Sequence, residues 1–395
     1  IEMLLNFLNL RITPLIPEKG SVGASGDLAP LSHMVLPLIG KGNVLYNKKE
    51  KNALEVLKSH NLKPLKLHAK EGLALINGTQ AMTAIGALVL QKAKRLTDLA
   101  DCIASMSIEA LMGSKSAFKK ELHAVRPHKG QMTVAENLNK MLGQSEIMES
   151  HKDCTQVQDA YSLRCIPQVH GAVRDTLEHA EKVITIEMNS VTDNPIVLPD
   201  TEEVISCGNF HGEPVALVMD FVSIALSELA NISERRIERL VNPQLSNGLP
   251  AFLTAKSGLN SGFMIAQYTA AALVSENKSF SHPASVDSIP TSANQEDHVS
   301  MGTIGARKAA MILKNVENVI AIEALCSAQG IDLRKPLKPS KGVQILHDSI
   351  RIKINELIED RNISEDINNM TAVIISKDFH SSIIKFLDNG KDNAN

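Results

Sequence analysis

The residues of this chain that could do chemistry are most concentrated in Gly20-Ser-Val-Gly-Ala-Ser-Gly-Asp-Leu-Ala-Pro-Leu-Ser-His-Met34. Three glycines surround Ser25 in this segment, and Asp27 follows directly. Glycine tolerates conformations and close approaches that other residues cannot, so a tight loop is the simplest interpretation. A phosphate-binding loop is disfavoured, because it requires a Gly-Lys-Ser/Thr ending that is absent here. Asp27 would also lie against the phosphate, and Pro30 interrupts the helix that should follow.

A third interpretation is a covalent modification of Ala24-Ser25-Gly26. The amide nitrogen of Gly26 can attack the carbonyl carbon of Ala24, because a glycine has no Cβ to block the approach. Loss of water closes a five-membered ring, and loss of the Ser25 hydroxyl leaves an exocyclic methylidene group. The product, a methylidene-imidazolone, is a strong electrophile that forms without any bound cofactor.

Two polar segments further along the chain could bind a substrate. Asn77 lies where an apolar run meets a predicted helix start, a position at which asparagine commonly caps a helix. In Gln158-Asp-Ala-Tyr161-Ser-Leu-Arg164, a spacing of three would place three polar side chains on one helical face. Arginine can bind a carboxylate through two hydrogen bonds, as an α-amino acid substrate requires. An exposed surface turn is an equally simple interpretation of this second segment.

The remaining polar segments have simple structural explanations. Glu296 precedes a long apolar predicted helix, where the helix dipole favours an acidic residue. The segment Gly208-Asn-Phe-His-Gly-Glu-Pro214 has the composition of a loop. The chain has no HExxH motif, and its thirteen histidines are scattered, so we predict no metal site.

Taken together, these segments carry a family resemblance. All fifteen residues from Gly20 to Met34 resemble the prosthetic-group loop of the aromatic amino acid ammonia-lyases, most closely the histidine ammonia-lyases. The Asn-Gly-Thr-Gln segment at 77–80, the block at 158–168 and Gln-Glu-Asp-His at 295–298 are similar to further motifs of that family. The resemblance extends over the whole chain.

The resemblance implies conversion of L-histidine to trans-urocanate and ammonia by an electrophile formed from Ala24, Ser25 and Gly26. No exogenous cofactor or metal is implied. Asp27 is expected to assist cyclisation. Further roles are implied for residues of the other motifs. Asn77 and Gln158 orient the substrate and prosthetic group, Tyr161 is catalytic, Arg164 anchors the substrate carboxylate, and Phe210 forms a wall of the site. Glu296 is implied to be a catalytic residue that faces the imidazole and takes part in proton transfer.

Glu296 decides the predicted substrate, because a carboxylate stabilises an imidazolium or accepts an imidazole N–H. Two alternatives stay open. A lyase or aminomutase acting on phenylalanine or tyrosine would share every motif except the surroundings of Glu296. A non-enzymatic helical scaffold, or an inactive relative, would keep Ser25 uncyclised.

The family also carries a catalytic tyrosine and a substrate-binding histidine well upstream of the loop. Here only 23 residues precede Ala24, and the first of them is Ile1 rather than Met. We therefore expect that an N-terminal segment is missing, and that residues 1–395 alone have little or no activity.

The elements that must position these residues are predicted to be long helices. Apolar residues recur at spacings of three and four from Met82 to Met106, which predicts a helix beginning near Asn77. A short hairpin is predicted at Ile196–Leu198 and Val204–Ser206. Other predicted helices cover Pro167–Met188, Pro214–Val241, Phe263–Ser279, Asp297–Gln329 with Gly330 as its C-terminal cap, and Val343–Asp360.

These elements predict a mainly α-helical fold, an extended long-helix bundle of the ammonia-lyase/fumarase-like type with a small β-hairpin. Residues 1–75 would hold the prosthetic-group loop, 76–330 the bundle core, and 331–395 a C-terminal helical segment. Helices that are apolar on more than one side are usually covered by other helices, often from other subunits. That agrees with the homotetramer, with sites shared between subunits, that the resemblance implies.

Composition limits the partners of the chain. A net charge of −3 and a pI near 6.5 give no electrostatic reason to expect binding to nucleic acid or to an anionic membrane. The five cysteines include no CxxC pair, which is typical of reduced thiols in a cytoplasmic protein. No uninterrupted apolar run reaches the ~18 residues of a membrane span.

Overall fold

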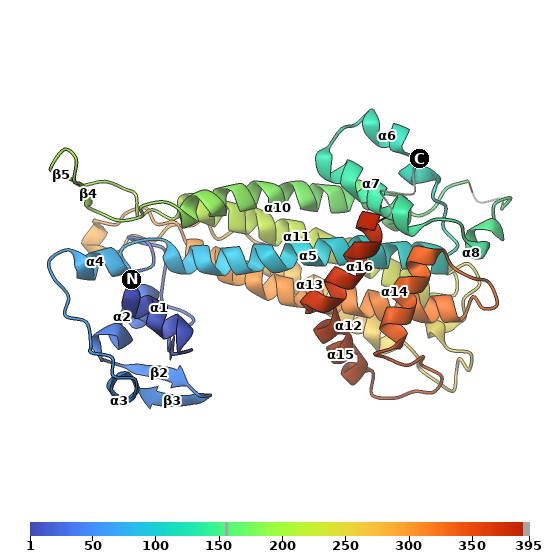
Figure 1. Cartoon of the computed structure of the whole chain (residues 1–395). Coiled ribbons are helices and arrows are strands. Elements are labelled where there is room, and N and C mark those ends of the chain that lie inside the picture. The colour runs from blue at the N-terminus through green and yellow to red at the C-terminus, as the bar shows by residue number, and fades with distance from the viewer. Residues whose placement is uncertain (155–156, 390–395) are drawn as a thin grey trace. The chain divides into compact units, whose positions relative to one another are not determined.

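The computed structural model describes residues 1–154 and 157–389. Its described part consists mainly of α-helices, with a three-stranded and a two-stranded antiparallel sheet (Figure 1). The prediction of a mainly α-helical fold with long helices and a small hairpin is therefore confirmed.

The chain divides into two compact units, each made of several segments. The first unit contains Ile1–Leu88, Glu181–Asp220 and Pro283–Lys308, and the second contains Val89–Ala180, Phe221–His282 and Ala309–Asn395. The division of the sequence into 1–75, 76–330 and 331–395 stays a prediction.

Four long helices were predicted, and three of them lie close to their predicted bounds. These three are α5 (Gln80–Ala110), α10 (Ile166–Met188) and α11 (Glu213–Val241), and the fourth is α13 (Gly302–Asp332). The prediction for α13 was wrong at both ends, because the helix begins five residues later than Asp297 and continues through Gly330. Gly330 lies inside the helix, where a Cβ would come within 2.8 Å of the Ala110 Cβ. Close helix packing thus explains this glycine better than a terminal cap does.

The first unit contains a small sheet that the sequence did not reveal. Strands β1 (Thr13–Pro14), β2 (Asn43–Tyr46) and β3 (Lys49–Asn52) pair antiparallel in that order. All four residues of β3 are exposed, so the strand lacks the apolar alternation that predicts strands. The turn between β2 and β3 has positive φ at Asn47 and Lys48, and the lysines around it are exposed.

A separate cluster of apolar side chains supports this sheet. Its members come from α1 (Glu2–Asn9), from β2, from α3 (Ala53–Ser59) and from the 3₁₀ helix at Leu36–Ile39, together with Ile12, which precedes β1. The buried side chains of this cluster are Met3, Phe7, Ile12, Leu38, Val44, Ala53, Val56 and Leu57.

The core of the second unit is formed where α5, α11 and α13 lie side by side (Figure 1). Ser107 of α5 and Ser233 and Arg236 of α11 all bond to Glu323 of α13. Every residue of α13 from 319 to 332 is buried. A helix that is apolar on all sides must be buried on all sides. The second unit itself buries this part of α13, as its apolar sequence requires.

The remaining elements are shorter. The predicted hairpin is present as β4 (Ile196–Leu198) and β5 (Glu203–Ile205). The helix predicted at Val343–Asp360 ends at Arg351. The other helices are α2 (Leu28–Val35), α4 (Glu71–Ile76), α6 (Lys120–Ala124), α7 (Lys129–Met141), α8 (Glu146–Glu149), α9 (Tyr161–Arg164), α12 (Met264–Phe280), α14 (Lys341–Arg351), α15 (Ile363–Ile375) and α16 (Lys377–Asn389).

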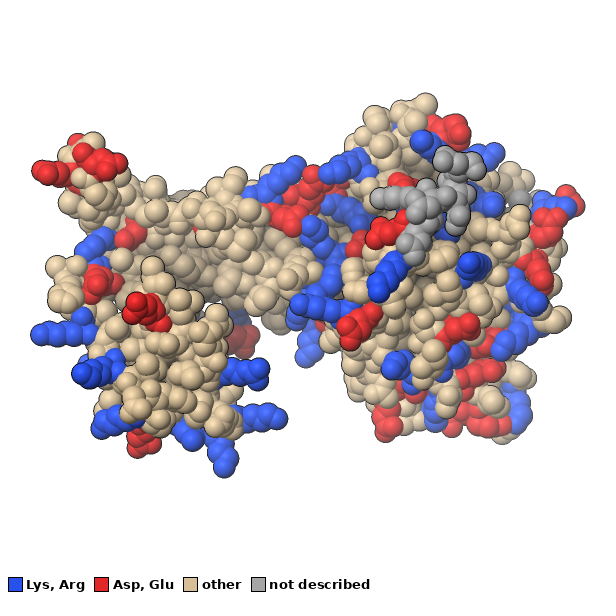
Figure 2. Space-filling model, viewed as in Figure 1, with Lys and Arg blue, Asp and Glu red and all other residues tan. Residues whose placement is uncertain are grey.

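Two helical stretches are long and apolar enough to cross a membrane by length and composition alone, Glu71–Ala110 and Glu213–Val241. The buried core helix of a globular protein passes the same test, and both stretches are partly buried. On the face shown in Figure 2, basic and acidic side chains are intermingled. All five cysteines are free thiols.

Candidate active site

The glycine-rich loop of the first unit folds back tightly around Ser25. Ser25 has φ +46°, a left-handed conformation that a non-glycine residue rarely adopts, and Gly26 has φ +70°. A Cβ on Gly26 would lie 2.2 Å from the backbone oxygen of Gly78. The backbone N–H of Asp27 donates to the same oxygen at 2.7 Å. Gly26 is therefore required both for its φ and for this close approach.

The other side of the loop packs against the segment that leads into α13. A Cβ on Gly23 would lie 2.2 Å from the Ser300 Oγ, and the backbone N–H of Met301 donates to the Val22 oxygen at 2.8 Å. Ser300 is fully buried. The loop is thus held from two directions by segments far from it in sequence.

Asp27 is buried and anchors the loop to the starts of two long helices. Its Oδ2 accepts the Met82 backbone N–H at 2.8 Å, in the first turn of α5. Its Oδ1 accepts a hydrogen bond from the Thr303 hydroxyl, in the first turn of α13, and one from Ser21 at 3.4 Å. Burial raises the pKa of the Asp27 carboxyl above its usual value, and the hydrogen bonds from Thr303, Met82 and Ser21 oppose that shift.

Asn77 lies beside this loop, but it does not cap the start of a helix. It follows the last residue of α4, and α5 begins three residues later. Its Nδ2 donates to the Asn194 oxygen at 2.9 Å and to the Asp193 Oδ1 at 3.2 Å. Lys70 pairs with the same aspartate at 2.7 Å. The Oδ1 of Asn77 is buried and has no protein partner, so it can accept a hydrogen bond from a bound group.

Glu296 contacts the glycine-rich loop at Ser25. The Ser25 Oγ donates to the Glu296 Oε1 at 2.7 Å, across 271 positions of sequence. The Glu296 Oε2 accepts a hydrogen bond from the Thr291 Oγ at 2.7 Å. Glu296 lies six residues before α13 begins, so the expected stabilisation of Glu296 by the helix dipole was wrong. Its contacts with Ser25 and Thr291 account for its position instead.

The Phe210 segment approaches the same region through a shared neighbour. Phe210 is half-buried in the loop that ends at Gly212. A Cβ on Gly212 would lie 3.0 Å from the Ser300 Oγ, the side chain that also faces Gly23. The role of Phe210 as a wall of the site stays a prediction.

The only described group of three potential metal ligands in mutual reach is His211, Glu213 and His298. Both ring nitrogens of His211 are already used, because Nδ1 accepts the Glu213 backbone N–H at 3.3 Å and Nε2 lies 3.1 Å from the His298 backbone oxygen. A metal bound through His211 would have to displace one of these bonds.

The predicted carboxylate-binding segment lies in the second unit. The expectation of one helical face was wrong for Gln158, which precedes the single turn of α9. Tyr161 is 71% exposed, and the Arg164 guanidinium stacks over its ring at 4.7 Å. The Arg164 Nε is buried without a protein partner. The pair therefore presents a guanidinium with an unused donor beside a phenol.

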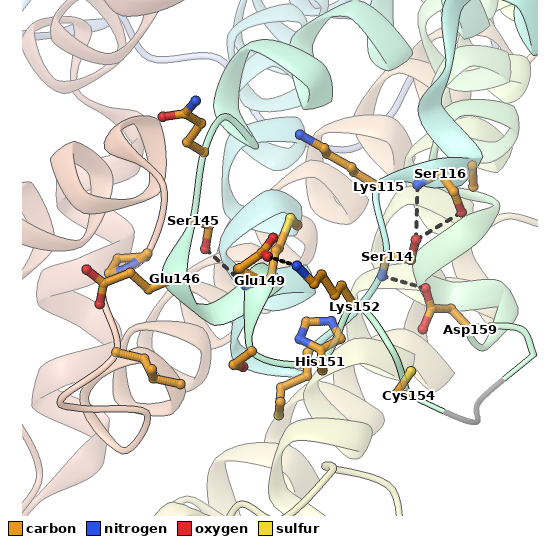
Figure 3. A pocket seen from close by; sticks show the side chains of 18 of the residues that line it. Ser114, Lys115, Ser116, Ser145, Glu146, Glu149, His151, Lys152, Cys154 and Asp159 are labelled. Carbon is orange, nitrogen blue, oxygen red and sulfur yellow. Dashed lines mark hydrogen bonds and ion pairs between the residues drawn. The ribbon is translucent and has the colours of Figure 1, made fainter.

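The second unit contains a cavity of about 1280 Å³, part of whose lining is drawn in Figure 3. Gln158 and Arg164 are among its lining residues. Its other walls carry side chains of both charges. Lys152 pairs with Glu149, and the Ser114 backbone N–H donates to Asp159 at 2.7 Å. The cavity is large enough for an amino acid, but its walls alone do not select one.

The structure thus brings together Ser25, Asp27, Asn77 and Glu296 in the first unit. It places Gln158, Tyr161 and Arg164 in the second unit. Five residues that hold these groups in place were not predicted from the sequence, namely Thr303, Thr291, Ser300, Asp193 and Lys70. A hydroxyl residue in the first turn of an apolar helix was the available signal for Thr303, whereas nothing in the sequence pairs Thr291 with Glu296.

The residues around the loop fit a prosthetic group made from Ala24, Ser25 and Gly26. The absence of a Cβ at Gly26 is what lets Gly78 approach, and the same absence leaves the Gly26 nitrogen accessible for ring closure. The orphaned Oδ1 of Asn77 and the buried carboxyl of Asp27 are polar groups available to such a ring.

Comparisons with known proteins find a matching family, similar sequences and similar solved structures. A sequence model of the family described as "Aromatic amino acid lyase" matches residues 1–352. The histidine ammonia-lyase of Caldanaerobacter subterraneus subsp. tengcongensis is 58% identical over 95% of this chain and 74% of its own length. The solved histidine ammonia-lyase from Trypanosoma cruzi is 47% identical, with a TM-score of 0.90 over 98% of this chain and 73% of that one. The tyrosine aminomutase from Streptomyces globisporus is 39% identical, with a TM-score of 0.90 over 98% and 76%.

Proposed function

Because the chain belongs to the aromatic amino acid lyase family, we propose that it is a carbon–nitrogen lyase that eliminates ammonia from L-histidine and releases trans-urocanate. The high identity to histidine ammonia-lyases supports this reaction over the alternatives. The choice of substrate rests on the position of Glu296. Its carboxylate lies 2.7 Å from the Ser25 hydroxyl, beside the proposed electrophile, where it can meet an imidazole.

The reaction is difficult because the β-hydrogen of histidine is scarcely acidic and ammonia is a poor leaving group. A methylidene-imidazolone formed from Ala24, Ser25 and Gly26 would supply an electrophilic carbon for this chemistry. Asp27 would assist its formation by fixing the loop on the starts of α5 and α13. The fit of Gly26 against Gly78 supports this assignment.

The chain's other residues would bind and orient the substrate. The Arg164 guanidinium, with its unused Nε donor, suits the substrate carboxylate, and the neighbouring Tyr161 hydroxyl is exposed and can exchange a proton. Gln158 would assist in orienting the substrate. The free Oδ1 of Asn77 can accept a hydrogen bond from an amino group. Glu296 would accept the imidazole N–H or stabilise the imidazolium.

A homotetramer with sites shared between subunits is part of the proposal. Large apolar side chains stay exposed on the long helices: Ile186 of α10 in the first unit is 67% exposed, and Phe221 and Ile224 of α11 in the second are each 45% exposed. Such side chains are typical of surfaces that another subunit covers. We also place the enzyme in the cytoplasm, in keeping with its free thiols.

The test gives the full-length enzyme a panel of L-histidine, L-tyrosine and L-phenylalanine, and it follows the absorbance of each unsaturated product and the release of ammonia. We expect urocanate from histidine and little turnover of the other two. Equal turnover of phenylalanine and histidine would contradict the substrate, and a β-amino acid product would favour an aminomutase. Ser25→Ala should abolish ammonia release without changing helical content, because the variant cannot form the methylidene group.

A further inference from the structure

The contact between Ser25 and Glu296 exists in the unmodified chain, before any prosthetic group has formed. In that state the Ser25 Oγ is not yet lost, and the Glu296 Oε1 lies 2.7 Å from it. The Oγ is the atom that must leave in order to create the methylidene group. A carboxyl group in hydrogen-bond contact with a leaving oxygen has the geometry of a general acid.

The Glu296 carboxyl is fixed in this position by its own segment. Its Oε2 accepts the Thr291 hydroxyl at 2.7 Å, and the backbones of Thr291 and Glu296 bond to each other at 3.0 and 3.3 Å. Between them, Ser292, Ala293 and Asn294 all have positive φ, from +53° to +67°. Non-glycine residues rarely adopt this conformation, so three in succession form a turn that is held by its surroundings. The orientation of Glu296 toward Ser25 thus exists before any substrate binds.

From this geometry we propose that Glu296 is the acid that drives dehydration of Ser25 when the prosthetic group forms. This role rests on the proposed function and precedes any contact of Glu296 with substrate. It makes Glu296 a catalyst of the chain's own modification.

The modification balances as the loss of two waters. The Gly26 nitrogen adds to the Ala24 carbonyl carbon, and its own N–H proton passes to that carbonyl oxygen to give a hydroxyl group. This hydroxyl group then leaves as the first water with the Ser25 N–H proton, and a C=N bond forms between the Ala24 carbonyl carbon and the Ser25 nitrogen. The Ser25 Cα proton, acidified by the ring, then passes to a water molecule, and its electron pair forms the Cα=Cβ bond. The Cβ–Oγ bond breaks as Oγ takes the proton of the Glu296 carboxyl and leaves as the second water. The resulting Glu296 carboxylate recovers a proton from solvent.

The experiment measures the intact mass of the expressed 395-residue chain as a function of time after synthesis. The unchanged protein should become lighter than its sequence by two waters. Glu296→Gln keeps the shape and hydrogen bonding of the side chain but cannot donate a proton as an acid, so it should lose at most one water. Asp297→Asn, which changes an exposed neighbouring carboxylate, should lose both at the normal rate.

Two further variants separate an acid from a merely structural residue. Glu296→Asp retains a carboxyl group and should mature, although more slowly. Glu296→Ala should be rescued by added acetate, with faster rescue at lower pH, where more of the acid form is present. Circular dichroism of Glu296→Gln identical to that of Asp297→Asn would show that the arrested chain is folded.

The outcomes distinguish this inference from the proposed function. Complete loss of two waters by Glu296→Gln at the normal rate would overturn the role in dehydration, while urocanate formation by the unchanged enzyme would still support the function. An unchanged chain that forms urocanate and yet keeps its full sequence mass would overturn both the dehydration and the electrophile.

Discussion

The Arg236 guanidinium of α11 and the Glu323 carboxylate of α13 form an ion pair that is completely buried in the second unit, with Nη2 2.8 Å from Oε2. The hydroxyl groups of Ser107 and Ser233 also donate hydrogen bonds to the Glu323 carboxylate, at 2.7 and 2.5 Å. The Arg236 Nη1 also reaches the backbone oxygen of Ser162, within the turn that carries Tyr161 and Arg164, at 3.4 Å. The ion pair and its two serine partners therefore join three long helices and support the segment that carries Arg164.

We expect Arg236→Met to lower the free energy of unfolding by about 3–5 kcal/mol, because it leaves the Glu323 charge buried without its partner. Arg236→Met combined with Glu323→Leu should cost less, since no charge then stays buried. Urea unfolding followed by circular dichroism measures both. Lys129→Met, which removes an exposed pair with Glu178, is the control and should change little. A double variant less stable than Arg236→Met would contradict this account.

The helical part of the fold could be predicted because the long helices carry a clear three-and-four periodicity. The bounds of α5, α10 and α11 follow from that pattern. The sheet of β1, β2 and β3 was missed because its strands are very short and β3 is wholly exposed. Their pairing depends on the turn at Asn47 and Lys48 and on contacts with α1 and α3, which periodicity does not record.

Candidate site residues could be named from the sequence, and their roles stay predictions, but the geometry of the site could not be predicted. The glycine spacing around Ser25 indicated a ring-forming loop, and the acid at Glu296 indicated the substrate. The sequence does not say that these two residues touch, because 271 positions separate them and the contact depends on the turn after Thr291. The hydrogen bond between Asn77 and Asp193 could not be predicted either, because most polar loop segments have no contact that their composition reveals.

A second prediction concerns Arg164. Arg164→Lys replaces a planar guanidinium, which has several N–H donors in a fixed geometry, by a compact ammonium group. Losing a charge-assisted hydrogen bond costs ~1.5–3 kcal/mol. That corresponds to roughly one to two decades in kcat/KM for histidine. We expect the loss mainly in KM, because the carboxylate does not react. Steady-state kinetics measures it, with Arg361→Lys, an arginine paired with Asp366, as control. An unchanged KM would exclude Arg164 as the carboxylate anchor.

A third prediction tests the steric requirement at Gly26. Gly26→Ala would place a Cβ 2.2 Å from the Gly78 oxygen at φ +70°, so the loop must move. Overpacking of this kind typically costs about 1–3 kcal/mol. We expect a lower Tm and a chain that keeps its full sequence mass, because ring closure needs the tight loop. Gly143→Ala, where no heavy atom lies within 4 Å of the new Cβ, is the matched control. Normal maturation of Gly26→Ala would show that this approach is not needed.

The last prediction is a pH dependence of stability that originates at Asp332. Burial of this carboxyl favours its neutral form, but hydrogen bonds from His347 and Lys335 and the charge of Arg351 outweigh burial and hold its pKa well below the usual value. The Asp332 Oδ1 lies 3.0 Å from the His347 Nε2 and 2.8 Å from the Lys335 Nζ, and the Asp332 Oδ2 lies 2.8 Å from the Arg351 Nε. Because the pKa in the folded state is depressed, the stabilisation is fully present above the unfolded pKa of about 3.9 and is lost as the pH falls toward the folded value.

Asp332→Asn should therefore unfold more easily than the unchanged chain at pH 7, by an amount on the order of 2 kcal/mol, which is typical of a depressed aspartate pKa. The difference should stay constant down to about pH 5 and shrink below about pH 4, as the carboxylate of the unchanged chain becomes protonated. Urea unfolding at a series of pH values measures it. Asp200→Asn, in the exposed turn between β4 and β5, should follow the unchanged chain throughout. A difference that persisted undiminished at low pH would show that Asp332 stabilises the fold by its shape rather than by its charge.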